Sequence, residues 1–546
     1  MRWLVSLSGL VASLGLIVSA QQAKQIDFRR MQSLREQLNP ETPNWSADYI
    51  FERAAEHLAT IPDEQKLKVR YFSLAEVPRA NLPMAVASLL FWCPSASVSP
   101  FVMRLQPVPD TDGRLWWFDL DWFRWTPEVW ENIANEDPYY RNPIVSTENP
   151  GLKYLLAATK SNAIIRGDWF VFYASDTSLF LKGEDKQADN AFYYQLLYSS
   201  NETETEVEET KTVMDKWEVP YKVTKQVRDR YGRMTTVEDY EWRVEERPRK
   251  ETVKVKKKSF GVPKTLKEFQ DFWEAQQNHL KRFPIDRGAV VDEGESFVSF
   301  HNRTLQRIRT KLGVYWQSYD VFRTAGDQDF VENLIAPPKR FDASEIIVQD
   351  GKGAQIYFLT DGKGNRVELA DPRLVHDTVS GGNFAVITAK SCVACHVQGI
   401  IPMKNEIPLM IKQGVEIKAL KPLDERIRSF YLSNLDRLVK TDQEEYSEFI
   451  RTCNGLTAEE NARQFTEFRK SYDLPLTFKQ AARELGSNTE EFGTALSIST
   501  KGRLGRLILD GKTIPRQTWE KGLYAESGLL LLEYRKSAKA HGFNVP

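Results

Sequence analysis

Cysteine is scarce in this chain of 546 residues, which has only four. So few cysteines exclude a small scaffold held together by many disulfides. Cys392 and Cys395 lie in one short motif, whereas Cys93 and Cys453 are far apart in sequence. These last two would be able to pair in an oxidising compartment, but Cys93 follows an apolar run and fits a buried thiol equally well. The sequence leaves both interpretations open.

An excess of charge of one sign is also lacking. The chain has 74 basic and 75 acidic residues, which gives a formal net charge of −1. Domains that bind nucleic acids usually have a strong basic excess, so we expect no nucleic-acid partner. Apolar residues make up 41% and charged residues 27%, as in ordinary folded proteins, and the length predicts several domains.

Long apolar runs are missing beyond the N-terminus. Residues 3–18 form one apolar run of 16 residues, which follows Arg2 and precedes small residues up to Ala20. This pattern predicts a cleaved signal peptide over residues 1–20, and the alternative is an uncleaved membrane anchor. No cysteine directly follows the run, so a lipid anchor is not expected. We expect a periplasmic or otherwise exported mature chain without a membrane span.

The remaining chain predicts an α+β multidomain protein. Residues 21–200 are expected to form an α+β domain of mixed helices and strands, and a small antiparallel sheet is expected over residues 297–369, directly before the cysteine motif. Within residues 21–200, residues 22–80 and 85–91 have helical spacing, and residues 101–105, 115–120 and 168–172 are typical of strands or buried segments. Residues 201–259 carry an acidic run at one end and a basic run at the other, with a turn signal at residues 229–232. They predict a charged β-hairpin or a flexible insertion, which is either solvated or a docking arm.

Turn signals and capping patterns divide the second half of the chain. Residues 260–375 predict an antiparallel β-rich region with a hairpin turn at residues 350–353. Residues 376–440 form the region around the cysteine motif, and residues 441–546 predict a helical bundle. Three capping boxes mark expected helix starts there: Thr441 with Glu444, Thr457 with Glu460, and Thr477 with Gln480.

The segment Cys392-Val393-Ala394-Cys395-His396 carries the clearest chemical signal. Two cysteines separated by two residues and followed by histidine form the pattern for covalent haem c attachment. One helical turn brings both thiols to one face for bonding to the two vinyl groups, and His396 then becomes the proximal iron ligand. A zinc site would need a second ligand pair, and a thiol-redox pair would be expected within a βαβ unit. Neither is evident in the sequence.

This segment resembles the haem site of a c-type cytochrome. The wider chain resembles large exported single-haem proteins of planctomycete bacteria, through residues 70–74, 166–170, 361–366 and the motif itself. The resemblance implies one covalent haem c on Cys392 and Cys395, iron bound by His396, and an α-helical cytochrome c-like region around them. It also implies electron transfer with redox protein partners.

The sixth iron ligand is not fixed by the sequence. Met403 is the first distal candidate, and the other candidates are Met410, His376, His301, His541, Lys404 and an open position. A Met or His ligand favours a simple electron carrier, whereas an open position favours a peroxidase-like enzyme or a ligand sensor. Arg166 and Asp168 would be the acid–base groups of such an enzyme, although structural pairing suits them better. A third alternative is a partner-binding protein in which haem is secondary. No catalytic residue is assigned.

Overall fold

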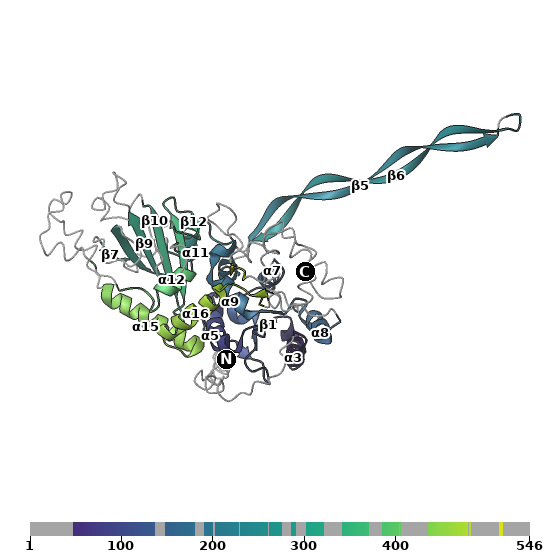
Figure 1. The fold of residues 1–546 in the computed structure, drawn as a ribbon. Helices are drawn as coiled ribbons and strands as arrows, with labels where there is room; N and C mark the ends of the chain where they lie inside the picture. The colour runs from purple at the N-terminus through teal and green to yellow at the C-terminus, as the bar shows by residue number, and fades with distance from the viewer. Residues whose placement is uncertain are drawn as a thin grey trace, which may run out of the picture. The chain divides into compact units, whose positions relative to one another are not determined.

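The computed structural model describes residues 47–136, 148–180, 191–199, 203–228, 230–259, 261–275, 285–290, 302–321, 341–370, 385–402, 405, 435–478, 480–481 and 513–516 (Figure 1). The expected signal peptide lies outside these residues. The chain divides into two compact units, one of residues 201–262 and one of everything else. The other expected domain boundaries, at residues 375/376 and 440/441, stay predictions.

A small mixed sheet forms the centre of the N-terminal region. Its strand order is β2-β3-β1-β4, where β1 is Val69–Ser73 and β3 is Leu115–Asp119. These two strands are antiparallel, but β4 (Ile164–Arg166) runs parallel to β1. Helices separate β4 from β1 in the sequence, and this crossover returns β4 in the parallel direction. The fourth strand, β2, is only Gln106–Pro107.

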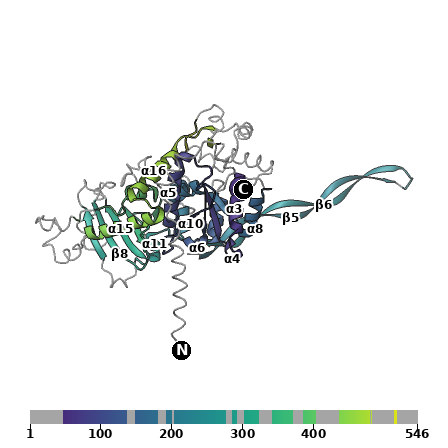
Figure 2. The same cartoon turned by 90° about the horizontal axis from the view of Figure 1, so that it is seen from below.

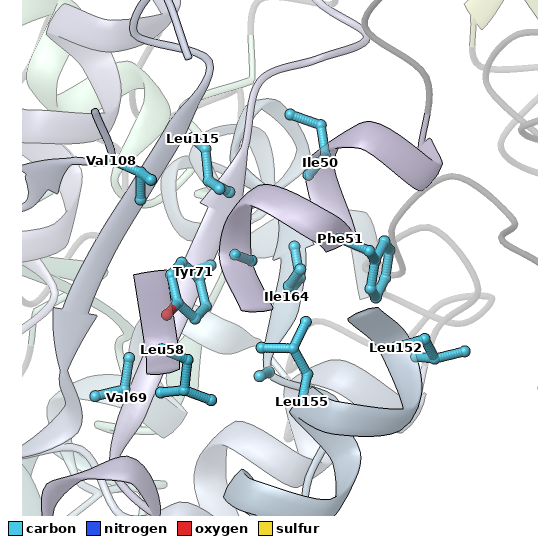
Figure 3. Packing of buried hydrophobic residues seen from close by; sticks show 12 residues of the cluster. Ile50, Phe51, Leu58, Val69, Tyr71, Val108, Leu115, Leu152, Leu155 and Ile164 are labelled. Carbon is cyan, nitrogen blue, oxygen red and sulfur yellow. The ribbon is translucent and has the colours of Figure 1, made fainter. Parts of the chain in front are cut away.

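Helices α3 (Ala47–Ala59) and α8 (Pro150–Thr159) pack on this sheet and on each other. Figure 3 shows their apolar side chains, such as Phe51 and Leu155, in one cluster with Tyr71 of β1. The two helices approach closely at Gly151, where a Cβ would lie 2.6 Å from the carbonyl oxygen of Phe51. Only glycine permits that contact, so this position fixes the crossing of the two helices.

Two helices in this region are buried on every side. Helix α5 (Leu82–Ser95) has the predicted helical form, whereas α9 (Gly167–Ser175) occupies residues predicted as strand-like. All nine residues of α9 are buried, so its sequence has no polar face. Periodicity cannot distinguish such a helix from a buried strand. Two further expectations were wrong: residues 101–105 form no strand, and residues 69–73 of the expected helical stretch form β1.

A six-stranded antiparallel sheet confirms the predicted β-rich region. Its order is β12-β11-β10-β9-β8-β7. The predicted turn joins β10 to β11, and the Asp350 carboxylate accepts hydrogen bonds there from the backbone N–H groups of Lys352 and Ala354, at 3.1 and 2.9 Å. The strands are β7 (Ile285–Val290), β8 (Asn302–Arg309), β9 (Gly313–Val321), β10 (Ala343–Asp350), β11 (Gln355–Asp361) and β12 (Arg366–Val367).

Two longer helices follow. Helix α16 (Ala458–Asp473) begins with the predicted capping box of Thr457 and Glu460, and Thr477 and Gln480 also make their reciprocal bonds. Helix α15 (Leu435–Asn454) does not begin at Thr441, which lies inside it and donates to the Arg437 carbonyl at 3.0 Å. Figures 1 and 2 show α15 lying along one face of the six-stranded sheet.

The remaining helical segments are short. Apart from α7 (Pro127–Glu136), each spans seven residues or fewer: α4 (Asp63–Lys66), η1 (Arg79–Asn81), α6 (Leu120–Phe123), η3 (Thr177–Phe180), α10 (Phe192–Leu197), α11 (Leu266–Phe272) and α12 (Lys390–Cys395). Within the described ranges, no helix combines the length and apolar character that crossing a bilayer requires.

Residues 201–262 form a unit of their own. It is a long two-stranded ribbon of β5 (Thr203–Arg228) and β6 (Met234–Ser259). The register places Glu204 opposite Lys258 and Glu208 opposite Lys254, so the acidic and basic runs lie side by side. Opposite charges at facing positions favour this register over a slipped one.

Candidate cofactor site

The cysteine motif lies on the short helix α12, which runs from Lys390 to Cys395. Cys392 and Cys395 are three residues apart, so one helical turn brings them to the same side. Both thiols are half-buried, while Val393 and Ala394 between them are buried. His396 ends the helix, and its backbone N–H donates to the Cys392 carbonyl at 2.7 Å. The two thiols and the imidazole are therefore held by one turn of backbone.

A sharp reversal introduces this helix. Ala389 has φ 67° and ψ −56°, and the N–H of Lys390 donates to the Thr388 carbonyl at 3.0 Å. These values describe a γ-turn of the strained type, which is rare for a residue with a side chain. The turn is buried and is held by the Thr388 N–H, which donates to the Glu368 carbonyl at 3.1 Å. The surrounding structure thus forces the backbone into the start of α12.

We expect Ala389→Gly to leave the free energy of unfolding unchanged or to raise it by up to about 1 kcal/mol. Glycine relieves backbone strain of about 1–3 kcal/mol, and this gain offsets the lost methyl group and the extra freedom of the unfolded chain. The matched control is Ala174→Gly inside helix α9, where the same change should cost about 1 kcal/mol or more. Chemical denaturation measures both. Equal losses of unfolding free energy in the two variants would show that the backbone at Ala389 is not strained.

Buried charges fix α12 to the rest of the fold. The Asp176 carboxylate lies 2.9 Å from Arg469 Nη2 on α16 and 3.6 Å from Lys390 Nζ on α12. Burial raises the pKa of Asp176, but the charges of Arg469 and Lys390 outweigh it and hold that pKa below its usual value. The carboxylate therefore stays ionised and links the two helices.

The His396 ring has a defined orientation. Its Nδ1 lies 3.0 Å from the Gly399 carbonyl oxygen. A carbonyl only accepts hydrogen bonds, so Nδ1 carries the proton and the lone pair is on Nε2. Burial also lowers the pKa of His396, which favours the neutral ring. A neutral imidazole whose Nδ1–H is bound to a backbone carbonyl is the form in which histidine binds a metal through Nε2.

Gly399 owes its position to a turn with φ +96°, packed against β11 and α15. A Cβ at Gly399 would lie 3.2 Å from Gln355 Nε2 and 3.2 Å from Tyr446 Cδ1. Gln355 Nε2 is buried and, among the described residues, has no hydrogen-bond partner. A buried donor without a partner beside the motif is a polar group that a bound cofactor can satisfy.

Two buried tyrosines, Tyr193 and Tyr357, lie within electrostatic reach of Cys392. The Tyr357 hydroxyl donates to Gln355 Oε1 at 3.1 Å, and the Tyr193 hydroxyl accepts from the Tyr357 backbone N–H at 3.1 Å. Burial raises the pKa of Tyr357 and of Tyr193, and the charge of Cys392 raises both further. These tyrosines therefore stay neutral. The surroundings of Cys392 therefore contain polar hydroxyl and amide groups but no phenolate charge.

Other candidates named from the sequence fall elsewhere. Met403, Lys404, Met410, His376, His301 and His541 lie outside the described residues. Arg166 and Asp168 form a buried ion pair of 2.7 Å, with the guanidinium 5.2 Å from the centre of the Trp169 ring, which fits the structural pairing expected for them. The part of the chain that the structure describes holds no group of three His, Cys, Asp or Glu side chains arranged for a bare metal ion.

Cys93 and Cys453 lie on α5 and α15 as buried thiols and form no disulfide. Burial raises the pKa of each thiol, and the charge of Cys453 raises that of Cys93 further, so the two lie in one neighbourhood. The packing of α5 on α15, seen in the contact of Phe91 with Phe449, brings them there. Of the two alternatives for Cys93, a disulfide or a buried thiol, this structure has the buried thiol, which packs as a small apolar side chain.

Two parts of the site were missed in the sequence. Gly399 follows His396 by three residues and is a residue type typical of turns, but the sequence does not indicate that its carbonyl binds His396. Gln355 had no signal, because it follows the β10–β11 turn more than thirty residues before the motif. Comparisons with protein-family models, curated proteins and solved structures found no match to this chain.

Proposed function

We propose that this chain is an exported monohaem c-type cytochrome that transfers single electrons between redox partners. One observation carries the proposal. The motif spacing of Cys392, Cys395 and His396 coincides with a neutral His396 whose Nδ1–H is bound to the Gly399 carbonyl. The residues fit the group: two thiols on one helical turn, a nitrogen lone pair beside them, and a buried amide donor at Gln355 without a described partner.

Each residue has a distinct task in this proposal. Cys392 and Cys395 would each add an S–H across one vinyl group, so that a thioether bond forms and no atom is lost. His396 Nε2 would bind iron, while the Gly399 carbonyl holds the ring in place. The haem supplies one-electron chemistry through its iron. The fold supplies a fixed orientation of the His396 ring and neutral tyrosine side chains near the motif.

The test is a visible spectrum of the purified protein, oxidised and reduced, after expression with a haem-attachment system. A low-spin spectrum that does not change when carbon monoxide is added to the reduced protein supports the electron carrier. A high-spin spectrum, or one that changes with carbon monoxide, overturns simple electron transfer and favours the enzyme or sensor with an open iron position. Absence of covalent haem overturns the proposal itself.

A further inference from the structure

Three charged side chains share one place on the six-stranded sheet. Arg303 on β8 binds Asp320 on β9 through Nε and Oδ1 at 2.6 Å and through Nη2 and Oδ2 at 3.2 Å. Arg303 Nη1 also lies 3.2 Å from Glu345 Oε2 on β10. We call Arg303, Asp320 and Glu345 the acidic trio. They face the same side of the sheet as Arg307 and Trp316, the side that α15 covers.

The acidic trio has a fully buried carboxylate, Asp320, between two half-buried side chains, and its charges do not balance. The side chain of Asp320 is 0% exposed, that of Arg303 is 12% exposed and that of Glu345 is 19% exposed. One guanidinium serves two carboxylates, so the ionised trio has one negative charge in excess. An excess charge is costly in a buried site, and uptake of one proton removes it. Burial, together with the charges of Glu345 and Asp342, raises the pKa of Asp320 to about 6 against the opposing effect of Arg303.

Charges of the acidic trio change the pKa of His396, the iron-binding histidine of the proposed site. Glu345 raises the pKa of His396, and Arg303 lowers it, so both charges lie within electrostatic reach of its ring. The charged groups around Asp320 are thus Arg303 from β8, Glu345 from β10, and Asp342, which directly precedes β10 and donates its N–H to the Asp320 carbonyl at 2.8 Å. An electron that arrives beside His396 adds negative charge near this cluster.

We propose, on the basis of the proposed haem function, that the acidic trio is a redox-linked proton site. It takes up one proton from water when the haem accepts one electron from a redox protein, and it releases that proton when the electron leaves. The electron stays on the iron and the proton on a trio carboxylate, so the net charge near His396 does not change. The affinity for the electron then falls as the pH rises.

The main experiment is a redox titration of the full holoprotein from about pH 4 to about pH 8. At a fixed applied potential, the ratio of reduced to oxidised wild-type protein should fall by up to about tenfold per pH unit across the window in which the trio titrates. Asp320→Asn removes the excess charge and should abolish this fall. Glu345→Gln should do the same, since Arg303 then serves Asp320 alone, and it replaces Asp320→Asn if that variant does not fold.

A second measurement does not depend on haem. Because the pKa of Asp320 is raised in the folded state, the folded chain binds more protons than the unfolded chain between about pH 4 and about pH 6. The free energy of unfolding gains a contribution that is complete at low pH and is lost as the pH rises through this window. Asp320→Asn should remove that slope. The matched control is Asp168→Asn, which removes another buried carboxylate paired with an arginine and should leave the pH dependence of the redox titration unchanged.

The outcomes separate the two proposals. A pH-dependent titration that Asp320→Asn abolishes and Asp168→Asn retains supports the proton site. Covalent haem with a titration that does not depend on pH, or that Asp320→Asn leaves unchanged, overturns the proton site and leaves the cytochrome proposal intact. Absence of covalent haem overturns the cytochrome proposal and the redox link with it, whereas the unfolding measurements still decide whether the trio binds a proton.

Discussion

The double variant Cys392→Ala and Cys395→Ala is expected to lose all covalently bound haem. The two thiols on one turn of α12 are the two attachment points, and alanine keeps the helix because it is the strongest helix former. Each single variant should keep one thioether bond and retain part of the stain. Haem staining of the denatured protein on a gel measures the attachment, because non-covalent haem leaves the chain on denaturation.

The chain offers a matched control for this experiment. Cys93→Ala and Cys453→Ala remove two buried thiols that lie on α5 and α15. Burial raises the pKa of both thiols, so they stay protonated and should bind no haem. The variant that carries both Cys93→Ala and Cys453→Ala is therefore expected to show full haem staining. Covalent haem that persists in the Cys392 and Cys395 double variant would refute attachment at the motif.

The variant Asp442→Ala should lower the free energy of unfolding by about 3 kcal/mol, the cost of leaving a buried charge without its partner. Asp442 on α15 accepts from Arg307 Nε at 3.0 Å, from Arg307 Nη2 at 2.8 Å and from Trp316 Nε1 at 2.6 Å. Both Arg307 and Asp442 are buried. Alanine would leave the guanidinium with the Asp286 carboxylate, 3.6 Å away, and with the charge of Glu445. Chemical denaturation measures the loss.

The same helix provides the control for Asp442. Asp436→Ala removes an exposed carboxylate from the first turn of α15 and should cost less than about 1 kcal/mol. If the two variants lose similar amounts of unfolding free energy, the buried pair of Arg307 and Asp442 does not hold α15 on the sheet. Asp442→Ala should also loosen the loop after the motif, because Gln443 Nε2 donates to the Ile400 carbonyl at 2.9 Å.

Local signals in the sequence predicted local structure well. The turn from Asp350 to Gly353 and the capping box of Thr457 form as expected, because each depends on hydrogen bonds within a few residues. Thr441 shows the limit of the same rule. Its capping pattern lies inside α15, since the packing of Leu435 and Val439 against Trp316 and Ile400 extends the helix to an earlier start.

Features that depend on distant residues were not predictable. All nine residues of α9 are buried, so no exposed polar face marks it as a helix in the sequence, and only its packing between β1, β4 and α5 decides its form. The parallel position of β4 likewise depends on a crossover of several helices. In the site, nothing near the motif indicates Gln355 or the acidic trio, because these residues lie on strands that the sheet brings to α12.

The sequence by itself determined the spacing of Cys392, Cys395 and His396, because one helical turn fixes that spacing without help from the rest of the chain. It also determined the hairpin turns and the cap of α16 through short-range hydrogen bonds. Only the tertiary structure decided which nitrogen of His396 carries the proton, since the Gly399 carbonyl is held there by β11 and α15. It also placed an uncompensated carboxylate on the sheet within electrostatic reach of that ring, because strands far apart in sequence become neighbours only when the sheet forms.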